Sequence, residues 1–170
     1  MSDRDYCIRR DFSSMRDIKR IDVICGLVKQ LWINFRANDN KTGFFYITNL
    51  LELEADKRFK QDSYDPFYWE EDKWYDFMQE LITSSKKLKQ NFPLEETQEI
   101  KNTVEYFRRY WLIYPDFRFK QFLNVFDDLF EVRIREDILT DKFWKQLIAP
   151  EVVKHQERLA QLKKGYNNGN

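Results

Sequence analysis

The 170-residue sequence has only four glycines, four prolines, two cysteines and one histidine. Because the turns of sandwiches and barrels need glycine and proline, their scarcity, together with few β-branched runs, favours helices. A chain of this length buries roughly 70% of its extended surface, so it folds without a disulfide or a structural metal. Cys7 and Cys25 lack the CxxC spacing, and we expect reduced thiols in a cytoplasmic protein.

The sequence also lacks an excess of charge of either sign, and it lacks a long hydrophobic run. The 29 basic and 29 acidic side chains give a formal net charge of zero, whereas nucleic-acid-binding domains usually carry an excess of positive charge. We therefore do not expect direct nucleic-acid binding. The most apolar stretch, residues 23–33, contains Lys29 and Gln30 and is too short to cross a bilayer. With its charged N-terminus, the sequence predicts neither a signal peptide nor a membrane segment.

Aromatic residues, in contrast, are abundant, with 15 Phe, 9 Tyr and 5 Trp. They gather in residues 110–124, where a helix carrying Trp111 runs into Pro115, which ends it. Asp116 is predicted to cap the next helix, since its carboxylate can accept from the first free backbone N–H groups. That helix has one aromatic face, formed by Phe119, Phe122, Leu123 and Phe126.

Apolar residues recur at three- and four-residue steps along most of the chain. This pattern predicts an all-α fold, a compact bundle of six or seven helices. Residues 1–13 are charged and show no periodicity, which indicates a flexible N-terminal arm. Ser14, Thr42 and Thr140 are predicted to cap helices. The predicted buried faces of the first two helices are Ile21, Ile24, Val28, Leu31, Trp32 and Phe35, then Phe44, Ile47, Leu50, Leu51 and Leu53.

The two halves of the chain share a pattern. Ile21 precedes Trp32 by eleven residues, and Ile100 precedes Trp111 by eleven. After each tryptophan comes a second aromatic helix with an asparagine at a matching place, Asn49 and Asn124. We interpret this as two degenerate three-helix repeats sharing an aromatic core, and a chance match of helical patterns is the alternative.

These repeats predict the organisation of the chain. After the arm, the first helical repeat covers residues 14–90 and the second covers residues 91–149. A C-terminal helix and tail follow at residues 150–170, because Pro150 suits the first turn of a helix. The oligomeric state is left open.

Residues able to carry catalysis or bind a metal are scarce. His155 stands alone in the last helix, where a solvated side chain is the usual role, and Cys25 lies on an apolar helix face. The carboxylates at 70–72 and 127–128 are consecutive, so they point around a helix axis and do not converge on one ion. The sequence therefore predicts no catalytic, cofactor-binding or metal-binding residue and a protein that is not an enzyme.

Two segments combine basic and aromatic residues, 106–111 and 117–120. Aromatic rings can stack on bases while arginine contacts phosphate, but at helical spacing these rings face the core. The polar residues of the corner remain open to two interpretations, a satisfied polar cluster that caps the helix or a surface that docks a partner. These residues are Asp116, Arg118, Gln121 and Asn124.

The segment from Tyr64 to Trp69 is the candidate partner-binding surface. It places four aromatic residues in six positions without helical spacing, so they cannot all face one core, and Asp65-Pro66 stiffens the turn. Exposed tyrosine and tryptophan are favoured anchors at protein interfaces, and the carboxylates beside them suit a basic partner. The alternative is that the aromatics close the gap between the two halves. The candidate residues are Tyr64, Phe67, Tyr68, Trp69, Glu70, Glu71 and Asp72.

Two motifs resemble a known family. Residues 111–124 resemble a W-x3-P-D-x-R-x-x-Q-x-x-N pattern, and residues 65–72 resemble its companion, D-x-F-Y-x-E-D-[DE]. Both are similar to motifs of short helical proteins from phages and prophages of Gram-positive bacteria, a resemblance that implies no catalytic or cofactor residues. It implies an accessory protein of a mobile element.

We therefore expect a non-enzymatic phage or prophage protein that needs no cofactor and binds a host protein. A host defence nuclease, inhibited as by an anti-CRISPR protein, is the expected kind of partner. The alternative is a nucleic-acid-associated phage regulatory factor.

Overall fold

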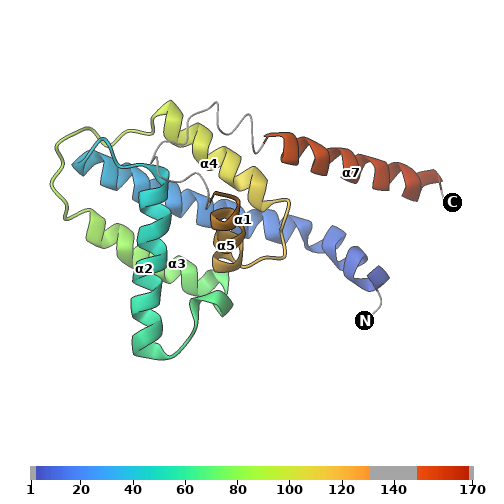
Figure 1. Cartoon of the computed structure of the whole chain (residues 1–170), viewed down its shortest axis with the longest axis horizontal. Coiled ribbons are helices and arrows are strands. Elements are labelled where there is room, and N and C mark those ends of the chain that lie inside the picture. The colour runs from blue at the N-terminus through green and yellow to red at the C-terminus, as the bar shows by residue number, and fades with distance from the viewer. Residues whose placement is uncertain (1–2, 131–148, 169–170) are drawn as a thin grey trace.

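The structure is a computed structural model that describes residues 3–130 and 149–168. Within these ranges the protein is all-helical, with six α-helices, one 3-10 turn and no strand (Figure 1), which confirms the predicted all-α bundle. The predicted cap at Thr140 and its helix lie outside the described residues. The elements are α1 (Asp3–Asn38), α2 (Phe44–Asp62), η1 (Pro66–Tyr68), α3 (Glu71–Ser85), α4 (Gln98–Trp111), α5 (Phe119–Phe130) and α7 (Ala149–Asn168).

The long helix α1 is the central element of the fold. It packs against both α3 and α4, which lie on opposite sides of it in Figure 1, and α2 crosses it. Helix α7 contacts α4 and then extends away from the other helices. None of the described helices combines the length and apolarity that crossing a membrane requires.

Helix α1 begins earlier than the sequence predicts. It starts at Asp3, so the flexible arm expected at 1–13 is helical from that residue, and Ser14 lies inside the helix. The physical reason is that no proline precedes Pro66 and no glycine precedes Gly26, so nothing in the sequence ends the helix.

The start and the outer face of α2 also differ from expectation. Gly43 occupies the N-cap position and forms no side-chain cap, so the predicted Thr42 cap is wrong. The backbone carbonyl of Thr42 instead accepts from the indole Nε1 of Trp32 at 2.9 Å. Leu53, expected on the buried face, is 61% exposed because it lies two positions beyond the buried Leu51, on the other side of the helix.

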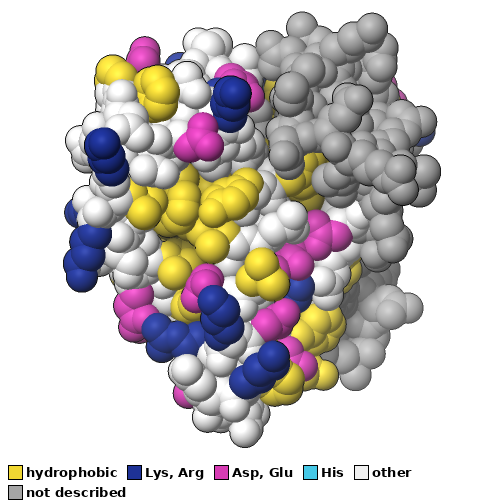
Figure 2. Space-filling view, turned by 60° about the vertical axis from the view of Figure 1, so that its left-hand side comes forward, with side chains coloured by type: hydrophobic (Ala, Val, Ile, Leu, Met, Phe, Trp, Pro, Cys, Tyr) yellow, Lys and Arg dark blue, Asp and Glu magenta, His cyan; other side chains and the backbone are white. Residues whose placement is uncertain are grey.

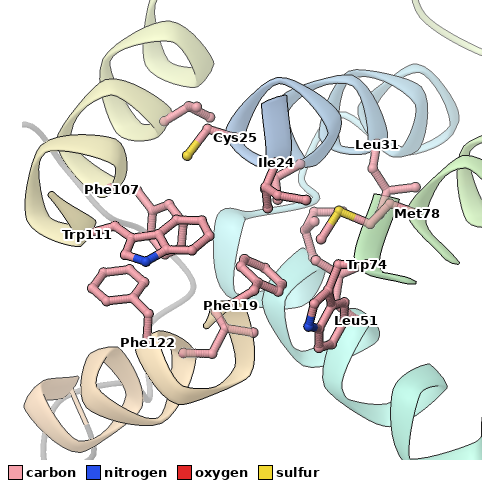
Figure 3. Packing of buried hydrophobic residues seen from close by; sticks show 14 of the residues in the cluster. Ile24, Cys25, Leu31, Leu51, Trp74, Met78, Phe107, Trp111, Phe119 and Phe122 are labelled. Carbon is pink, nitrogen blue, oxygen red and sulfur yellow. The ribbon is translucent and has the colours of Figure 1, made fainter. Parts of the chain in front are cut away.

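The core is one aromatic cluster shared by α1 to α5 (Figure 3). Trp111 of α4 stacks on Phe122 of α5 with ring centroids 5.4 Å apart. Phe119 then joins this group to Trp74 of α3, whose ring centroid lies 4.9 Å away. Because α4, α5 and α3 all place rings here, residues far apart in the sequence are held in one packed interior.

Both tryptophans that define the proposed repeats are buried, Trp32 at 1% and Trp111 at 0% exposure. Each lies near the end of its helix and is followed by a helix with a buried aromatic face. These features agree with a correspondence between the first two helices of each half, and the duplication stays a prediction. The third helix expected in the second half falls on residues outside the described ranges.

Candidate functional site: an aromatic turn

The segment Tyr64–Trp69, here called the aromatic turn, is shaped by its own sequence. Ser63 ends α2 in the left-handed conformation, with φ 57°, and its N–H donates to Phe59 O at 2.8 Å. The Asp65 carboxylate then accepts from the backbone N–H of Phe67 at 2.9 Å, and Pro66 is the first residue of η1. Aspartate and proline thus set a 3-10 turn at this point, as the sequence indicates.

Side-chain bonds within the turn fix it further. Trp69 Nε1 donates to the backbone carbonyl of Tyr64 at 3.0 Å, and the Tyr64 hydroxyl donates to Tyr68 O at 3.3 Å. The backbone N–H of Trp69 donates to Pro66 O at 3.1 Å. The start and the end of the turn are therefore tied to each other.

The start of α5 and the residue before it hold the turn from outside. Arg118 Nη1 donates to Tyr68 O at 3.2 Å, and Gln121 Nε2 donates to Phe67 O at 3.3 Å. Arg118 Nη2 also lies 3.9 Å from Glu70 Oε1. The two motifs of the resemblance thus meet in space, because the polar residues of the corner bind the backbone of the aromatic turn.

The same two residues also form the start of α5. Arg118 directly precedes the helix, its carbonyl accepts from Phe122 N at 2.9 Å, and its own N–H donates to Gln121 Oε1 at 3.1 Å. The prediction that Asp116 caps α5 is therefore wrong, because the helix begins at Phe119, two residues later than a cap at Asp116 requires.

The aromatic turn divides its rings between core and solvent. Trp69 is 1% exposed and packs on Trp74, with centroids 4.8 Å apart. The ring of Trp69 is therefore not the exposed interface anchor that the sequence suggests, because it fills a core site. Tyr64 is 44% exposed, and Phe67 and Tyr68, which meet edge to face at 5.1 Å, are 36% and 54% exposed.

The acidic residues beside the turn are partly neutralised. Glu71 pairs with Arg20 at 2.9 Å and its side chain is only 15% exposed, so it is removed from the surface offered to a partner. Glu70 is exposed and lies near Arg118, and Asp72 is exposed on the first turn of α3. Two of the three predicted carboxylates are thus placed where a partner can reach them.

Lys73 is also part of this site, although its place in the sequence does not indicate such a role. Its Nζ lies 5.0 Å from the ring centroid of Tyr64 and 4.9 Å from that of Trp69. Asp62 Oδ2 is 3.7 Å from the same nitrogen. Only the folded chain shows that this lysine covers two rings.

The other candidates have structural roles. The thiol of Cys25 is buried, and this burial, followed by the charge of Asp22, raises its pKa, so it stays protonated. In the part of the chain that the structure describes, no group of three or more His, Cys, Asp and Glu residues could hold a metal ion.

The two basic-aromatic segments direct most of their rings into the core, although Phe117 is 37% exposed, and they direct their cations to carboxylates of the same chain. Phe107 and Trp111 are buried, and Arg109 pairs with Glu105 at 3.0 Å. Arg108 pairs with Asp22, whose hydrogen bond raises the pKa of the guanidinium. Lys120 pairs with Glu52 at 3.2 Å. These cations are therefore engaged within the fold.

Hydrophobic side chains are exposed elsewhere as well. Figure 2 shows them gathered in a patch on one face, bordered by charged side chains of both signs. On α2, Tyr46 is 50% exposed and 5.8 Å from the ring of Phe35, and Leu53 is exposed on the same helix. None of the hydrogen bonds described for the turn reaches these α2 residues, which makes them a suitable comparison for it.

Comparison with protein-family models, with curated proteins and with solved structures finds no match to this chain. The fold and the site alone therefore define the class, an all-α protein that presents exposed aromatic rings on a fixed turn.

Proposed function

We propose that this chain is a non-enzymatic protein that binds another protein through the aromatic turn. The observation that carries the proposal is that Phe67 and Tyr68 expose their rings while Arg118 and Gln121 fix the backbone beneath them. The adjacent core site is already filled by Trp69, and Tyr68 leaves about half of its surface exposed.

A fixed turn lowers the entropy lost on binding. A mobile loop has to be ordered when it binds, at roughly 0.5–1.5 kcal/mol for each side chain immobilised. Here the hydrogen bonds from Arg118 and Gln121 order the backbone when the chain folds. Tyrosine and phenylalanine on such a support are the kind of residue that dominates binding energy at interfaces.

The charge around the turn favours a basic partner. Residues 62–73 carry five carboxylates, at 62, 65, 70, 71 and 72, and one cation, Lys73. Arg20 and Arg118, which pair with two of these carboxylates, raise the cations to three, so the region keeps two negative charges. A positively charged surface would be attracted to it, and nucleic-acid phosphates would be repelled.

We place this binding in a phage or prophage setting, on the resemblance of the two motifs. A host defence nuclease has a basic groove for nucleic acid, so it is a partner with the required chemistry. The chain would then act in the host cytoplasm and blunt the nuclease, as an anti-CRISPR protein does. The nucleic-acid-associated alternative is one outcome of the test below.

The test is affinity capture from a bacterial host lysate, with and without nuclease treatment. The bait proteins are wild type, Phe67→Ala/Tyr68→Ala, and the α2 control Tyr46→Ala/Leu53→Ala. A protein that resists nuclease treatment, binds wild type and control, and is lost with the turn variant supports the proposal. Recovery that depends on nucleic acid supports the alternative, and loss only with the α2 control would move the interface to that helix.

A further inference from the structure

We infer that Asp62, Tyr64 and Trp69 form a cation-binding site that Lys73 fills in the free chain and that a lysine or arginine of the partner enters by displacing it. This inference rests on the proposed function and deepens it, since it names the group of the partner that is recognised. It also gives the buried Trp69 a part in binding.

Three groups that attract a cation converge on one nitrogen. The Tyr64 and Trp69 ring centroids lie 5.0 and 4.9 Å from Lys73 Nζ, within the range of a cation–π contact. Asp62 Oδ2, at 3.7 Å, adds a carboxylate. Two rings and one carboxylate make a small cage for an ammonium or guanidinium group, and the chain's own lysine shows that such a group fits.

The cage does not depend on Lys73 for its shape. Trp69 is fixed by its Nε1 bond to Tyr64 O at 3.0 Å and by packing on Trp74 and Phe77. The hydroxyl of Tyr64 is bound to Tyr68 O. Both rings are therefore held by contacts that remain when the Lys73 side chain moves away.

Lys73 itself is held weakly enough to leave. Its side chain is 38% exposed and that of Asp62 is 45% exposed, and ion pairs at such exposure contribute little because water screens them. A lysine stem is long and flexible, so its ammonium group can swing into solvent. The site then lies beside the exposed rings of Phe67 and Tyr68, where the proposed partner binds.

The cage is tested without any partner, by titrating tetramethylammonium chloride against sodium chloride at equal ionic strength. The readout is the NMR signal of the Trp69 indole N–H. In Lys73→Ala we expect a saturable shift specific to tetramethylammonium, about tenfold weaker in wild type, where Lys73 competes. Tyr64→Ala/Lys73→Ala should lose it. No saturable shift in a folded Lys73→Ala protein overturns the inference.

A second measurement uses the captured partner. Lys73→Ala should bind it more tightly than wild type, and by more than the matched variant Lys57→Ala, which removes another exposed lysine paired with a carboxylate. Equal gains in affinity from the two variants would show that the loss of one positive charge is sufficient to strengthen binding, and would contradict the cage. If no tetramethylammonium binding is seen while Phe67→Ala/Tyr68→Ala still abolishes capture, the cage is overturned and the proposed function stands. If tetramethylammonium binds while the turn variant still captures the partner, the proposed function is overturned and only the cation-binding site remains.

Discussion

Trp32 and Trp111 make the same hydrogen bond in the two halves of the chain. Trp32 Nε1 donates to Thr42 O at 2.9 Å and Trp111 Nε1 donates to Phe117 O at 3.1 Å. Each acceptor lies two residues before the first residue of the next helix, Phe44 in one case and Phe119 in the other. The shared bond, which periodicity alone does not require, supports a duplication of the helix–corner–helix unit.

The first prediction follows from this equivalence. Trp32→Phe and Trp111→Phe each remove the indole donor and leave a carbonyl without its partner, so each should lower the free energy of unfolding by about 1–3 kcal/mol. The two alanine variants should lower it by about 3–5 kcal/mol. Urea unfolding measures both. A clear loss in one position with none in the other would contradict the equivalence.

The second prediction separates the two neighbours Tyr68 and Trp69. Trp69→Ala empties a core site and should lower the free energy of unfolding by about 3–5 kcal/mol. Tyr68→Ala removes an exposed ring and should change it by less than about 0.5 kcal/mol. Chemical unfolding of the two single variants decides this, and similar losses in both would place Tyr68 in the core as well.

The third prediction concerns the support of the turn. Arg118→Ala/Gln121→Ala removes both donors to the Phe67 and Tyr68 carbonyls, so the turn should open more often. We expect amide hydrogen exchange at Tyr68 and Trp69 to be about tenfold faster, with buried α1 amides unchanged. The matched control is Arg109→Ala, which removes another exposed, ion-paired arginine. Exchange equal to that of the control would show that α5 does not hold the turn.

The fourth prediction is a pH dependence. Burial raises the pKa of Cys25 above its ordinary value of 9.0, so the folded chain keeps this proton where the unfolded chain releases it. The stabilisation from Cys25 is therefore complete below pH 9 and is lost as the pH rises, by about 1.4 kcal/mol at pH 10. The difference in unfolding free energy between wild type and Cys25→Ala should shrink by this amount. Parallel profiles would contradict it.

Much of the fold was predictable because the hydrophobic pattern is regular. The core positions of α4, from Ile100 to Trp111, are buried as their spacing predicts, and Pro150 lies in the first turn of α7. The predicted helix starts were wrong where local capping preferences compete with the packing of the core. Thr42 and Asp116 are good capping residues, yet the helices begin beyond them, at positions set by the packing of Phe44 and Phe119.

The candidate site was predictable only in part. The sequence identified the aromatic turn but not which rings face inward, since Trp69 is buried by Trp74 and Phe77 of the next helix. Arg118 is fifty positions from Tyr68 in the sequence, and their bond depends on how α5 lies against η1. Lys73 is recognisable only once the rings beneath it are in place.

The central claim is that the exposed rings of the aromatic turn bind a protein partner, and a calorimetric titration of the purified partner tests it most directly. The turn variant Phe67→Ala/Tyr68→Ala should bind at least about 30-fold more weakly than wild type, about 2 kcal/mol, with an unchanged melting temperature. The α2 control Tyr46→Ala/Leu53→Ala should bind as wild type does. Wild-type affinity in a folded turn variant would contradict the claim.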